Sequence, residues 1–260
     1  MDNTDKKITQ MDMIAERAFN WAYESKAYSE SVRAELSDTT LLAAWKDVFS
    51  DTLPACEDKM LKIVDVGTGP GFFPIVLGQM GYPCIGADIS PEMLAEASRN
   101  AAIAGTPQEF IQADADSLPF DTESLDCIIS RNVTWTLPDA EKTYCYWWSL
   151  LAPHGRLIIF DANWNRQFHD PELMAQVQTD YLEYEKTYGV PAVHNTDRQD
   201  AYRRNAPMCK VHRPQWDLEK LAQLNWTCLR CDFNITQKIW PKEKQIRFRS
   251  TPMFVIVCEK

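Results

Sequence analysis

Short apolar runs alternate with longer amphipathic stretches through the middle of the chain. A run that is apolar at nearly every position indicates a strand buried on both faces. Five such runs follow one another, at residues 61–66, 83–88, 109–114, 125–130 and 155–162. The stretches between them have apolar residues at helical spacing. Together they predict an α/β, doubly wound fold around a mostly parallel, Rossmann-like sheet.

The two ends of the chain have different patterns. Residues 9–54 predict two helices, with Asp38 as the N-cap of the second. After residue 162 the alternation stops, and Asp170 and Gly189 bound a helix with an apolar stripe. A helix near residues 217–225 and two apolar runs at 227–235 and 253–260 then complete a seven-stranded sheet.

Composition excludes several classes of protein. The 260 residues are 45% hydrophobic and 25% charged, as in a globular protein, and their formal net charge of −10 disfavours a large nucleic-acid surface. No apolar run reaches the roughly 18 residues of a membrane helix, and the N-terminus has no signal-peptide pattern. We therefore expect a cytoplasmic protein without nucleic-acid or membrane partners, whose eight cysteines are reduced.

The first predicted strand ends in a glycine-rich turn. Gly67, Gly69 and Gly71 occupy alternate positions between a strand and a helix, where the backbone must bend sharply or lie against a ligand. The spacing differs from the G-x-G-x-x-G turn of dinucleotide-binding proteins, because Phe72 stands at its third glycine. Asp65 would repel a pyrophosphate, but it can bind an ammonium group or organise the loop. The turn suits a nucleoside-like ligand with a cationic tail.

Two further acidic residues end the next strands. Asp88 ends the second, where a carboxylate can accept hydrogen bonds from both hydroxyls of a ribose. Asp114 ends the third and precedes Ala115, so that a carboxylate and a backbone N–H can read the amino edge and a ring nitrogen of adenine.

These segments resemble the class I S-adenosylmethionine-dependent methyltransferases that act on small molecules. The resemblance rests on the glycine turn, Asp88 and the segments "ADADSLPF", "ESLDCIIS" and "LLAPHGRLIIFD", and it covers residues 61–162. It implies that S-adenosylmethionine is the cofactor and S-adenosylhomocysteine the product. It also implies that the glycine turn wraps the methionine part, that Ile89 flanks the adenine, and that Arg131 and Asn132 pass near the sulfonium. The N-terminal helix would form a lid with Tyr28 near the cofactor carboxylate. The predicted cofactor-binding residues are Tyr28, Asp65, Gly67, Thr68, Gly69, Gly71, Asp88, Ile89, Asp114, Ala115, Arg131 and Asn132.

Methyl transfer from a sulfonium is a direct in-line displacement, which depends on positioning and on exclusion of water. We therefore expect a closed, aromatic-lined pocket that presents an O, N or S atom of a small-molecule acceptor. The predicted pocket residues are Trp21, Tyr23, Trp135, Asp161, Asn163 and Trp164. His169 is the candidate general base, because it is the histidine nearest to the end of a strand.

Other functions remain open at this point. An aminopropyl transferase of the polyamine type shares the fold, and a non-catalytic partner of another methyltransferase would keep a cofactor site without turnover. Cys209, His212, Cys228 and Cys231 form a C-x-x-H…C-x-x-C pattern of the kind that binds zinc. We expect no metal there, because Cys228 and Cys231 lie in a strand-like run in which residues three apart face opposite sides.

The pattern divides the chain into four parts. We expect an N-terminal helical lid at residues 1–56 and the cofactor-binding half of the α/β core at 57–162. A helical insertion at 163–215 would cap the substrate, and residues 216–260 would close the core. The oligomeric state cannot be read from the apolar faces of the N-terminal helices.

Overall fold

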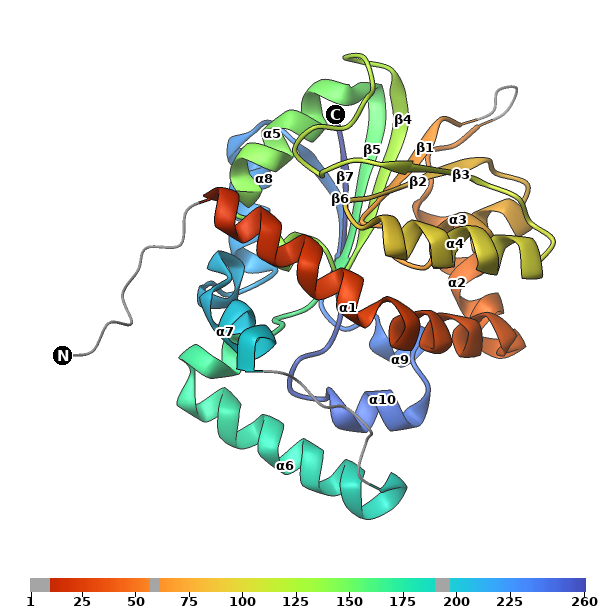
Figure 1. The fold of residues 1–260 in the computed structure, drawn as a ribbon. Coiled ribbons are helices and arrows are strands. Elements are labelled where there is room, and N and C mark those ends of the chain that lie inside the picture. The colour runs from red at the N-terminus through yellow and green to blue at the C-terminus, as the bar shows by residue number, and fades with distance from the viewer. Residues whose placement is uncertain (1–9, 57–60, 190–196) are drawn as a thin grey trace.

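A seven-stranded sheet forms the centre of the computed structural model, which describes residues 10–56, 61–189 and 197–260 (Figure 1). The strand order is β3-β2-β1-β4-β5-β7-β6. The strands are β1 (Ile63–Val66), β2 (Cys84–Asp88), β3 (Glu109–Gln112), β4 (Leu125–Arg131), β5 (Leu151–Asp161), β6 (Thr227–Asp232) and β7 (Phe254–Glu259). β1 to β5 pair in parallel, whereas β7 runs antiparallel to both β5 and β6. The predicted fold class is confirmed.

Helices precede, connect and follow these strands. The α-helices are α1 (Gln10–Ser37), α2 (Thr39–Thr52), α3 (Phe72–Gln79), α4 (Pro91–Ile103), α5 (Ala140–Leu150), α6 (Pro171–Tyr188), α7 (Asp197–Asn205), α8 (Gln215–Gln223), α9 (Thr236–Ile239) and α10 (Lys242–Arg247). Three short 3₁₀ turns are η1 (Thr134–Thr136), η2 (Arg166–His169) and η3 (Pro207–Lys210). Within the described residues, no helix is both long enough and apolar enough to cross a membrane.

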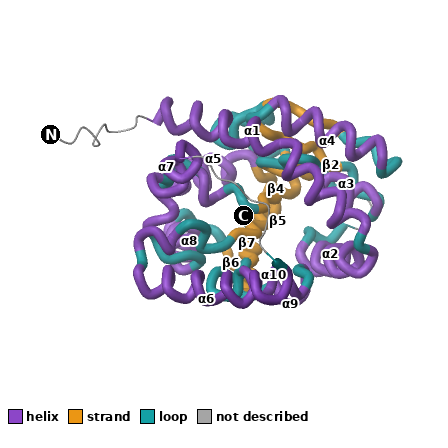
Figure 2. Tube along the Cα trace, turned by 60° about the horizontal axis from the view of Figure 1, so that its bottom comes forward, coloured by secondary structure: helices purple, strands orange, loops and turns teal. Residues whose placement is uncertain are grey.

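The sheet is buried on both faces, which explains why its central strands are apolar at nearly every position. Side chains alternate between two cores: Ile63 packs on one side of the sheet and Val64 on the other. Figure 2 shows the two helical layers, with α2 and α3 on one side and α5 and α8 on the other.

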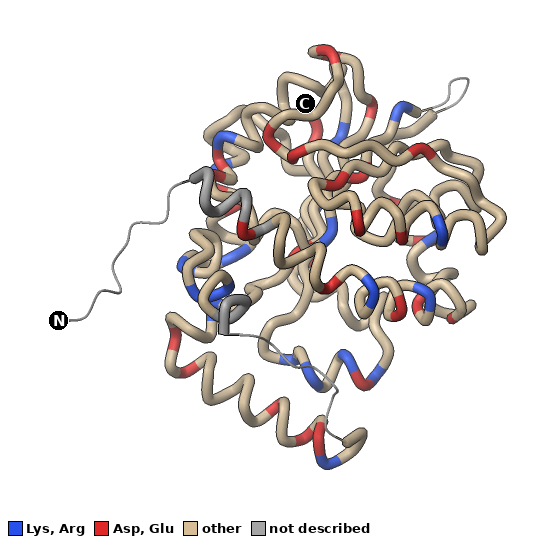
Figure 3. The backbone as a smooth tube through the Cα atoms, viewed as in Figure 1, with Lys and Arg blue, Asp and Glu red and all other residues tan. Residues whose placement is uncertain are grey.

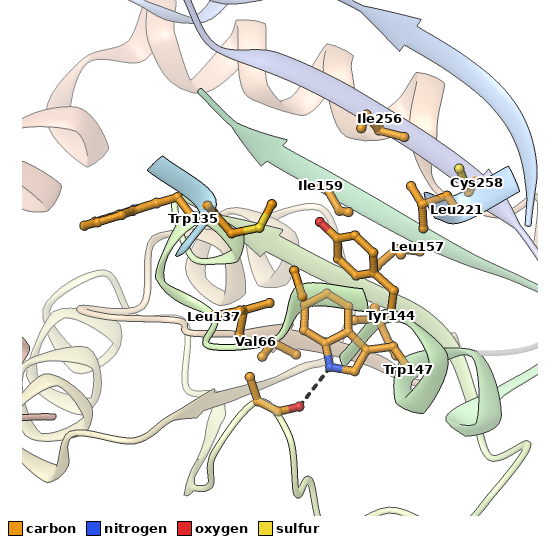
Figure 4. Close-up of a cluster of buried hydrophobic side chains, with 14 of the residues drawn as sticks. Val66, Trp135, Leu137, Tyr144, Trp147, Leu157, Ile159, Leu221, Ile256 and Cys258 are labelled. Atoms are coloured by element: carbon orange, nitrogen blue, oxygen red, sulfur yellow. Dashed lines mark hydrogen bonds between the residues drawn. The ribbon is translucent and has the colours of Figure 1, made fainter. Parts of the chain in front are cut away.

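Each core is rich in aromatic side chains. On the α2 side, the ring of Trp45 lies 5.0 Å from Phe73 and 5.2 Å from Phe160, in edge-to-face arrangements that favour tight packing. On the other side, Tyr144 and Trp147 of α5 fill the core (Figure 4). The Trp147 indole donates to the carbonyl of Ala115 at 3.0 Å, which anchors the segment after β3.

The predicted helix caps lie where the sequence places them. The carboxylate of Asp38 accepts hydrogen bonds from the backbone N–H groups of Thr40 and Leu41 at the start of α2. The side chains of Ser90 and Asp170 cap α4 and α6 in the same way.

The predicted insertion divides into two structural regions. α6 packs on α10 at one side of the molecule, and its apolar stripe is only half-buried because no sheet lies beneath it. Figure 3 shows basic residues gathered on α10 and acidic residues spaced along α6. The fully buried polar residue of α6 is Asp180, which accepts a hydrogen bond from the backbone N–H of Ser250 at 2.8 Å. α7 and η3 instead lie beside η1 and α1.

Candidate functional site

The turn after β1 requires glycine for both conformation and space. Gly67, Gly69 and Gly71 have φ angles of +68°, +52° and +84°, which L side chains rarely adopt. A Cβ atom at Gly67 would lie 2.3 Å from a methyl carbon of Val133, and one at Gly71 would lie 3.0 Å from the Cβ of Ala97. The turn therefore packs directly against the segment after β4 and against α4.

Asp88 holds this turn to the end of β2. One carboxylate oxygen accepts a hydrogen bond from the N–H of Gly69 at 2.8 Å, and the other accepts one from Ser90 at 2.9 Å. Each oxygen has a second lone pair, so the carboxylate retains acceptor capacity toward the adjacent cleft. Asp88 thus fixes the loop and faces the ligand side at once.

A cleft opens between this turn, the carboxyl ends of β1 to β4 and the helix α1. Its empty volume, counted together with the open solvent at its mouth, is about 740 Å³. Ten of the twelve predicted cofactor-binding residues line it: Tyr28, Asp65, Gly67, Thr68, Gly69, Asp88, Ile89, Ala115, Arg131 and Asn132. Gly71 instead forms the N-cap of α3, and Asp114 lies outside the lining, where its carboxylate accepts a hydrogen bond from the N–H of Asp116.

The negative charge of Asp65 is only partly compensated by its surroundings in the cleft. Its side chain at the end of β1 is 3% exposed. Burial raises the pKa of Asp65 to about 7, although a hydrogen bond with the side chain of Thr68 and the positive charge of Arg131 partly offset this effect. A cationic ligand beside Asp65 would stabilise the ionised carboxylate.

Arg131 brings a positive charge to the same end of the cleft. Its guanidinium lies over the ring of Phe72 at 4.4 Å and donates to the carboxylate of Glu35, on α1, at 3.0 Å. Burial favours loss of its proton, but the interactions with Glu35, Tyr28 and Asp65 together outweigh this effect and raise the pKa of Arg131. Lys244 of α10 pairs with the other oxygen of Glu35 at 2.5 Å. Glu35 and Lys244 lie far from Arg131 in the sequence, which gave no sign of this cluster.

The helix α1 closes the cleft through Trp21, Tyr28 and Val32. Polar contacts hold α1 against the core at three points along its length. Glu24 pairs with Arg203 of α7 at 2.9 Å, Ser29 accepts a hydrogen bond from Asn100 of α4 at 3.1 Å, and Glu35 binds Arg131. α1 therefore has the position predicted for the lid.

Three of the predicted pocket residues, all tryptophans, lie in or beside the cleft. Trp21 and Trp135 lie edge to face at 6.4 Å, and Trp135 also contacts the ring of Tyr202 at 6.2 Å. With Asn20, Glu24 and Arg203 these three rings line a smaller hollow beside the cleft. The indole of Trp164 donates to the side-chain oxygen of Asn132 at 3.1 Å, so Trp164 supports a residue of the cleft lining.

Two other predicted residues lie on the surface. Tyr23 is 63% exposed on the outer side of α1. His169 is exposed at the end of η2, and its imidazole Nε2 lies 2.8 Å from the carbonyl oxygen of Arg204. Neither lines the cleft or the hollow. Closeness to a strand end in the sequence did not predict the position of His169, because η2 takes the chain away from the cleft.

Asp161 is a structural residue rather than part of the pocket. Its carboxylate accepts hydrogen bonds from Arg213 at 2.8 Å and from the N–H of Trp135 at 3.0 Å. Arg213 also binds both oxygens of Asp217, at 2.8 and 2.9 Å, and Tyr144 donates to Asp217 at 2.6 Å. The side chains of Arg213 and of both aspartates are at most 1% exposed.

This buried network fixes the wall of the aromatic hollow. Thr134 of η1 joins it by donating to Asp161 at 2.5 Å, and Asn163 exchanges hydrogen bonds with the backbone of Arg213. Asp161 and Asn163 were predicted to line the pocket because they follow the fifth strand, but both are bound by Arg213, which lies 52 residues from Asp161. The spacing of four residues between Arg213 and Asp217, which suits a helical ion pair, was the available signal.

Comparison with known proteins finds relatives that match the same region of this chain. A family model described as "Methyltransferase domain" matches residues 64–159. A demethylmenaquinone methyltransferase of Thermus thermophilus is 34% identical over 109 residues, which are 41% of this chain and 50% of that protein. A ubiquinone/menaquinone biosynthesis C-methyltransferase of Cronobacter sakazakii is 31% identical over 169 residues, 61% of this chain and 62% of that protein. The matches thus span between half and two thirds of these relatives.

A solved structure extends the likeness over most of the fold. The geranyl diphosphate C-methyltransferase of Streptomyces coelicolor, in complex with Mg²⁺, geranyl diphosphate and S-adenosyl-L-homocysteine, superposes with a TM-score of 0.59. The superposition covers 89% of this chain and 83% of that one, at 16% identity. At this identity the likeness concerns the fold alone.

The buried network generates a prediction about stability. Arg213→Met leaves Asp161 and Asp217 buried without their shared cation, and we expect a loss of about 3–5 kcal/mol in the free energy of unfolding. Urea denaturation measures the loss. Arg249→Met, the same change at an arginine whose side chain is 53% exposed, should cost less than about 0.5 kcal/mol. Equal effects of the two substitutions would contradict the role assigned to the network.

Proposed function

We propose that this chain, whose α/β core belongs to the class I S-adenosylmethionine-dependent methyltransferases, transfers the cofactor's methyl group to a small-molecule acceptor. The observation that carries the proposal is the charge arrangement of the cleft. It combines the buried carboxylate of Asp65 and the guanidinium of Arg131 with a second carboxylate, Asp88, on the strand next to that of Asp65. A fold alone does not fix an activity, so the argument rests on these side chains.

The described residues fit the cofactor part by part. Asp65 would bind the ammonium group of the methionine end, and Arg131 would bind its carboxylate. Asp88 would accept from the ribose hydroxyls, while Ile89 and Ala115 pack beside the adenine. When bound, S-adenosylmethionine supplies a methyl group activated by the adjacent sulfonium. The protein's contribution is to hold the acceptor in line with that methyl group and to exclude water, with α1 as the lid.

Arg131 also distinguishes this proposal from an aminopropyl transferase. Such an enzyme takes a decarboxylated cofactor, which has no carboxylate for Arg131 to bind. A non-catalytic cofactor-binding partner would share every feature of the cleft described above. It is separated from an enzyme only by turnover.

The acceptor would enter through the aromatic hollow formed by Trp21, Trp135 and Tyr202. Its charged neighbours, Glu24 and Arg203, pair with each other, so the hollow offers no unbalanced charge to an acceptor. We therefore propose an uncharged, largely apolar acceptor. Within the described residues, the cleft and hollow linings include no histidine, which favours an acceptor atom that is already nucleophilic near neutral pH.

The acceptor atom proposed from the sequence was O, N or S, and carbon joins these candidates because the compared relatives include C-methyltransferases. The test is turnover with methyl-¹³C-labelled S-adenosylmethionine and a panel of uncharged aromatic and isoprenoid acceptors. The ¹³C chemical shift of the product identifies the atom that was methylated. Cofactor binding without turnover on any acceptor would favour the non-catalytic partner.

Asp88 provides the first prediction about the cofactor. We expect Asp88→Asn to weaken S-adenosylhomocysteine binding by about 10- to 100-fold, because the ribose loses a charged acceptor. Isothermal titration calorimetry measures the change, and the control is Asp121→Asn at an exposed aspartate. The thermal transition of each variant verifies folding, since Asp88 also holds the glycine turn. Unchanged affinity in folded Asp88→Asn would contradict the assignment.

Asp65 makes binding depend on pH. In the unliganded fold, its carboxyl takes up a proton below about pH 7, whereas in the unfolded chain it does so only near 3.8. Ionisation of Asp65 therefore costs the unliganded fold stability as the pH rises from about 4 to 7. A bound ammonium group favours the ionised form, so affinity for S-adenosylhomocysteine should rise as the pH rises through 7. Calorimetry between pH 6 and 7.5 should detect this rise together with proton release. Asp65→Asn should abolish both effects. If the affinity of the Asp65→Asn variant still rose with pH, the assignment would be refuted.

Arg131 allows a test that separates the two ends of the cofactor. We expect Arg131→Met to weaken S-adenosylhomocysteine binding at least about tenfold, through loss of a charge-assisted hydrogen bond. 5′-Methylthioadenosine lacks the carboxylate, so its affinity should change little in the same variant. Glu35 keeps Lys244 as its partner, which protects the fold. Parallel loss of both ligands would show that Arg131 has only a structural role.

A further inference from the structure

The edge strand β6 contains a β-bulge that changes which cysteines share a face. Cys228 lies opposite Cys258 of β7, and the register then shifts, so that Cys231 lies opposite Ile256. Directly opposed residues of an antiparallel pair project from the same face. Cys228, Cys231 and Cys258 therefore share the face covered by α8. The prediction that Cys228 and Cys231 face opposite sides was wrong, because it assumed an unbroken strand.

The zinc pattern considered from the sequence does not assemble around these residues. Cys209, in η3, is buried near Asp161 and hydrogen-bonds the side chain of Asn165 at the carboxyl end of the sheet. Cys258 lies opposite Leu157, four residues before the end of β5, and Cys228 lies opposite Cys258 at the same level of the sheet. Among the described residues, no three Cys, His, Asp or Glu side chains are grouped as metal ligands.

Cys228 and Cys258 have the arrangement of a reactive thiol and a resolving thiol. Cys228 is exposed at the sheet edge, whereas Cys258 is buried in the core beside Leu221 (Figure 4). Burial raises the pKa of the Cys258 thiol, and the neighbouring Cys228 side chain raises it further through its charge and a hydrogen bond. All eight cysteines of the chain are reduced in the structure.

Opposed residues of an antiparallel pair also have suitable backbone geometry for a bridge. Their Cα atoms lie about 4.5–5.5 Å apart, within the range of about 4.4–6.8 Å that disulfides span. Cys231 is opposed to Ile256 rather than to a cysteine, so the register favours only one cross-strand bridge.

We propose that Cys228 and Cys258 form a redox-active cross-strand dithiol that low-molecular-weight disulfides, such as oxidised glutathione, convert to a disulfide. The exposed Cys228 thiolate attacks glutathione disulfide, forms a mixed disulfide and releases one glutathione. Cys258 then attacks the Cys228 sulfur, which releases the second glutathione, and the proton of Cys258 passes to that departing thiolate. Both cysteines are oxidised by one electron each, and one glutathione disulfide is reduced to two glutathiones.

The bridge would close a loop that contains α9 and α10. α10 carries Lys244, the partner of Glu35 on the lid helix, so the oxidised form ties this region of the fold to the sheet. The dithiol lies toward the amino ends of the parallel strands, away from the cleft. Oxidation should therefore stabilise the fold without changing cofactor affinity.

The experiment treats the full chain with oxidised glutathione and follows intact mass, peptide mapping and the thermal transition. We expect a loss of about 2 Da, a Cys228–Cys258 linked peptide, and a melting temperature raised by roughly 5 °C or more. Cys228→Ser should abolish all three effects, and it leaves the buried Cys258 in place. Cys231→Ser and Cys145→Ser, the latter at an exposed cysteine of α5, should retain them.

Three outcomes would overturn the proposal: a stable glutathione adduct on Cys228, a bridge between Cys228 and Cys231, or no reaction in the folded protein. S-adenosylhomocysteine binding, measured before and after oxidation, is an independent readout. Failure of the proposed methyltransferase function would leave the dithiol test unaffected.

Discussion

The structure at the carboxyl edge of the sheet depends on how three buried carboxylates are compensated. Asp88 and Asp161 end β2 and β5, Asp65 is the last residue but one of β1, and each is at most 7% exposed. A buried carboxylate is tolerated only when hydrogen bonds or opposite charges compensate it. The three receive different compensation: Asp88 receives backbone N–H groups, Asp161 receives Arg213, and Asp65 receives incomplete compensation from the side chain of Thr68 and the field of Arg131. The last of these leaves a place for a ligand's positive charge.

The arrangement of the surrounding helices follows from these charges. Arg131 carries a second buried charge to the cleft, and Glu35 neutralises it from α1. The lid helix is therefore held by the same guanidinium that faces the ligand, and α10 shares the contact through Lys244. In the same way, Asp161 draws Arg213 and the start of α8 against η1. Charge compensation at strand ends thus positions elements that are distant in sequence.

Local signals in the sequence predicted the elements well, whereas pairings across the fold were not predictable. Capping residues such as Asp38 and Asp170, and the apolar strands, depend on neighbours within a few residues. The glycine turn was predictable from the strand and helix on either side, although its close approach to Val133 and Ala97 was not. The partners of Asp161 and Arg131 depend on how distant segments dock, so Arg213, Glu35 and Lys244 were missed. His169 and the face of Cys231 were misplaced because a 3₁₀ turn and a β-bulge redirect the chain.

In the proposed function, acceptor selectivity originates in the aromatic hollow. The predicted substrate cap, residues 163–215, does not act as one unit, because α6 packs on α10 while α7 contributes Tyr202 to the hollow beside Trp135. Trp135 is held in turn by the Asp161–Arg213 network, whose side chains are at most 1% exposed. One wall of the hollow is therefore fixed by the core, and the facing wall is formed by α1 and α7, which meet through the Glu24–Arg203 pair. Because a half-buried ion pair is easier to rearrange than a fully buried network, changes in acceptor preference should arise first on the α1–α7 wall.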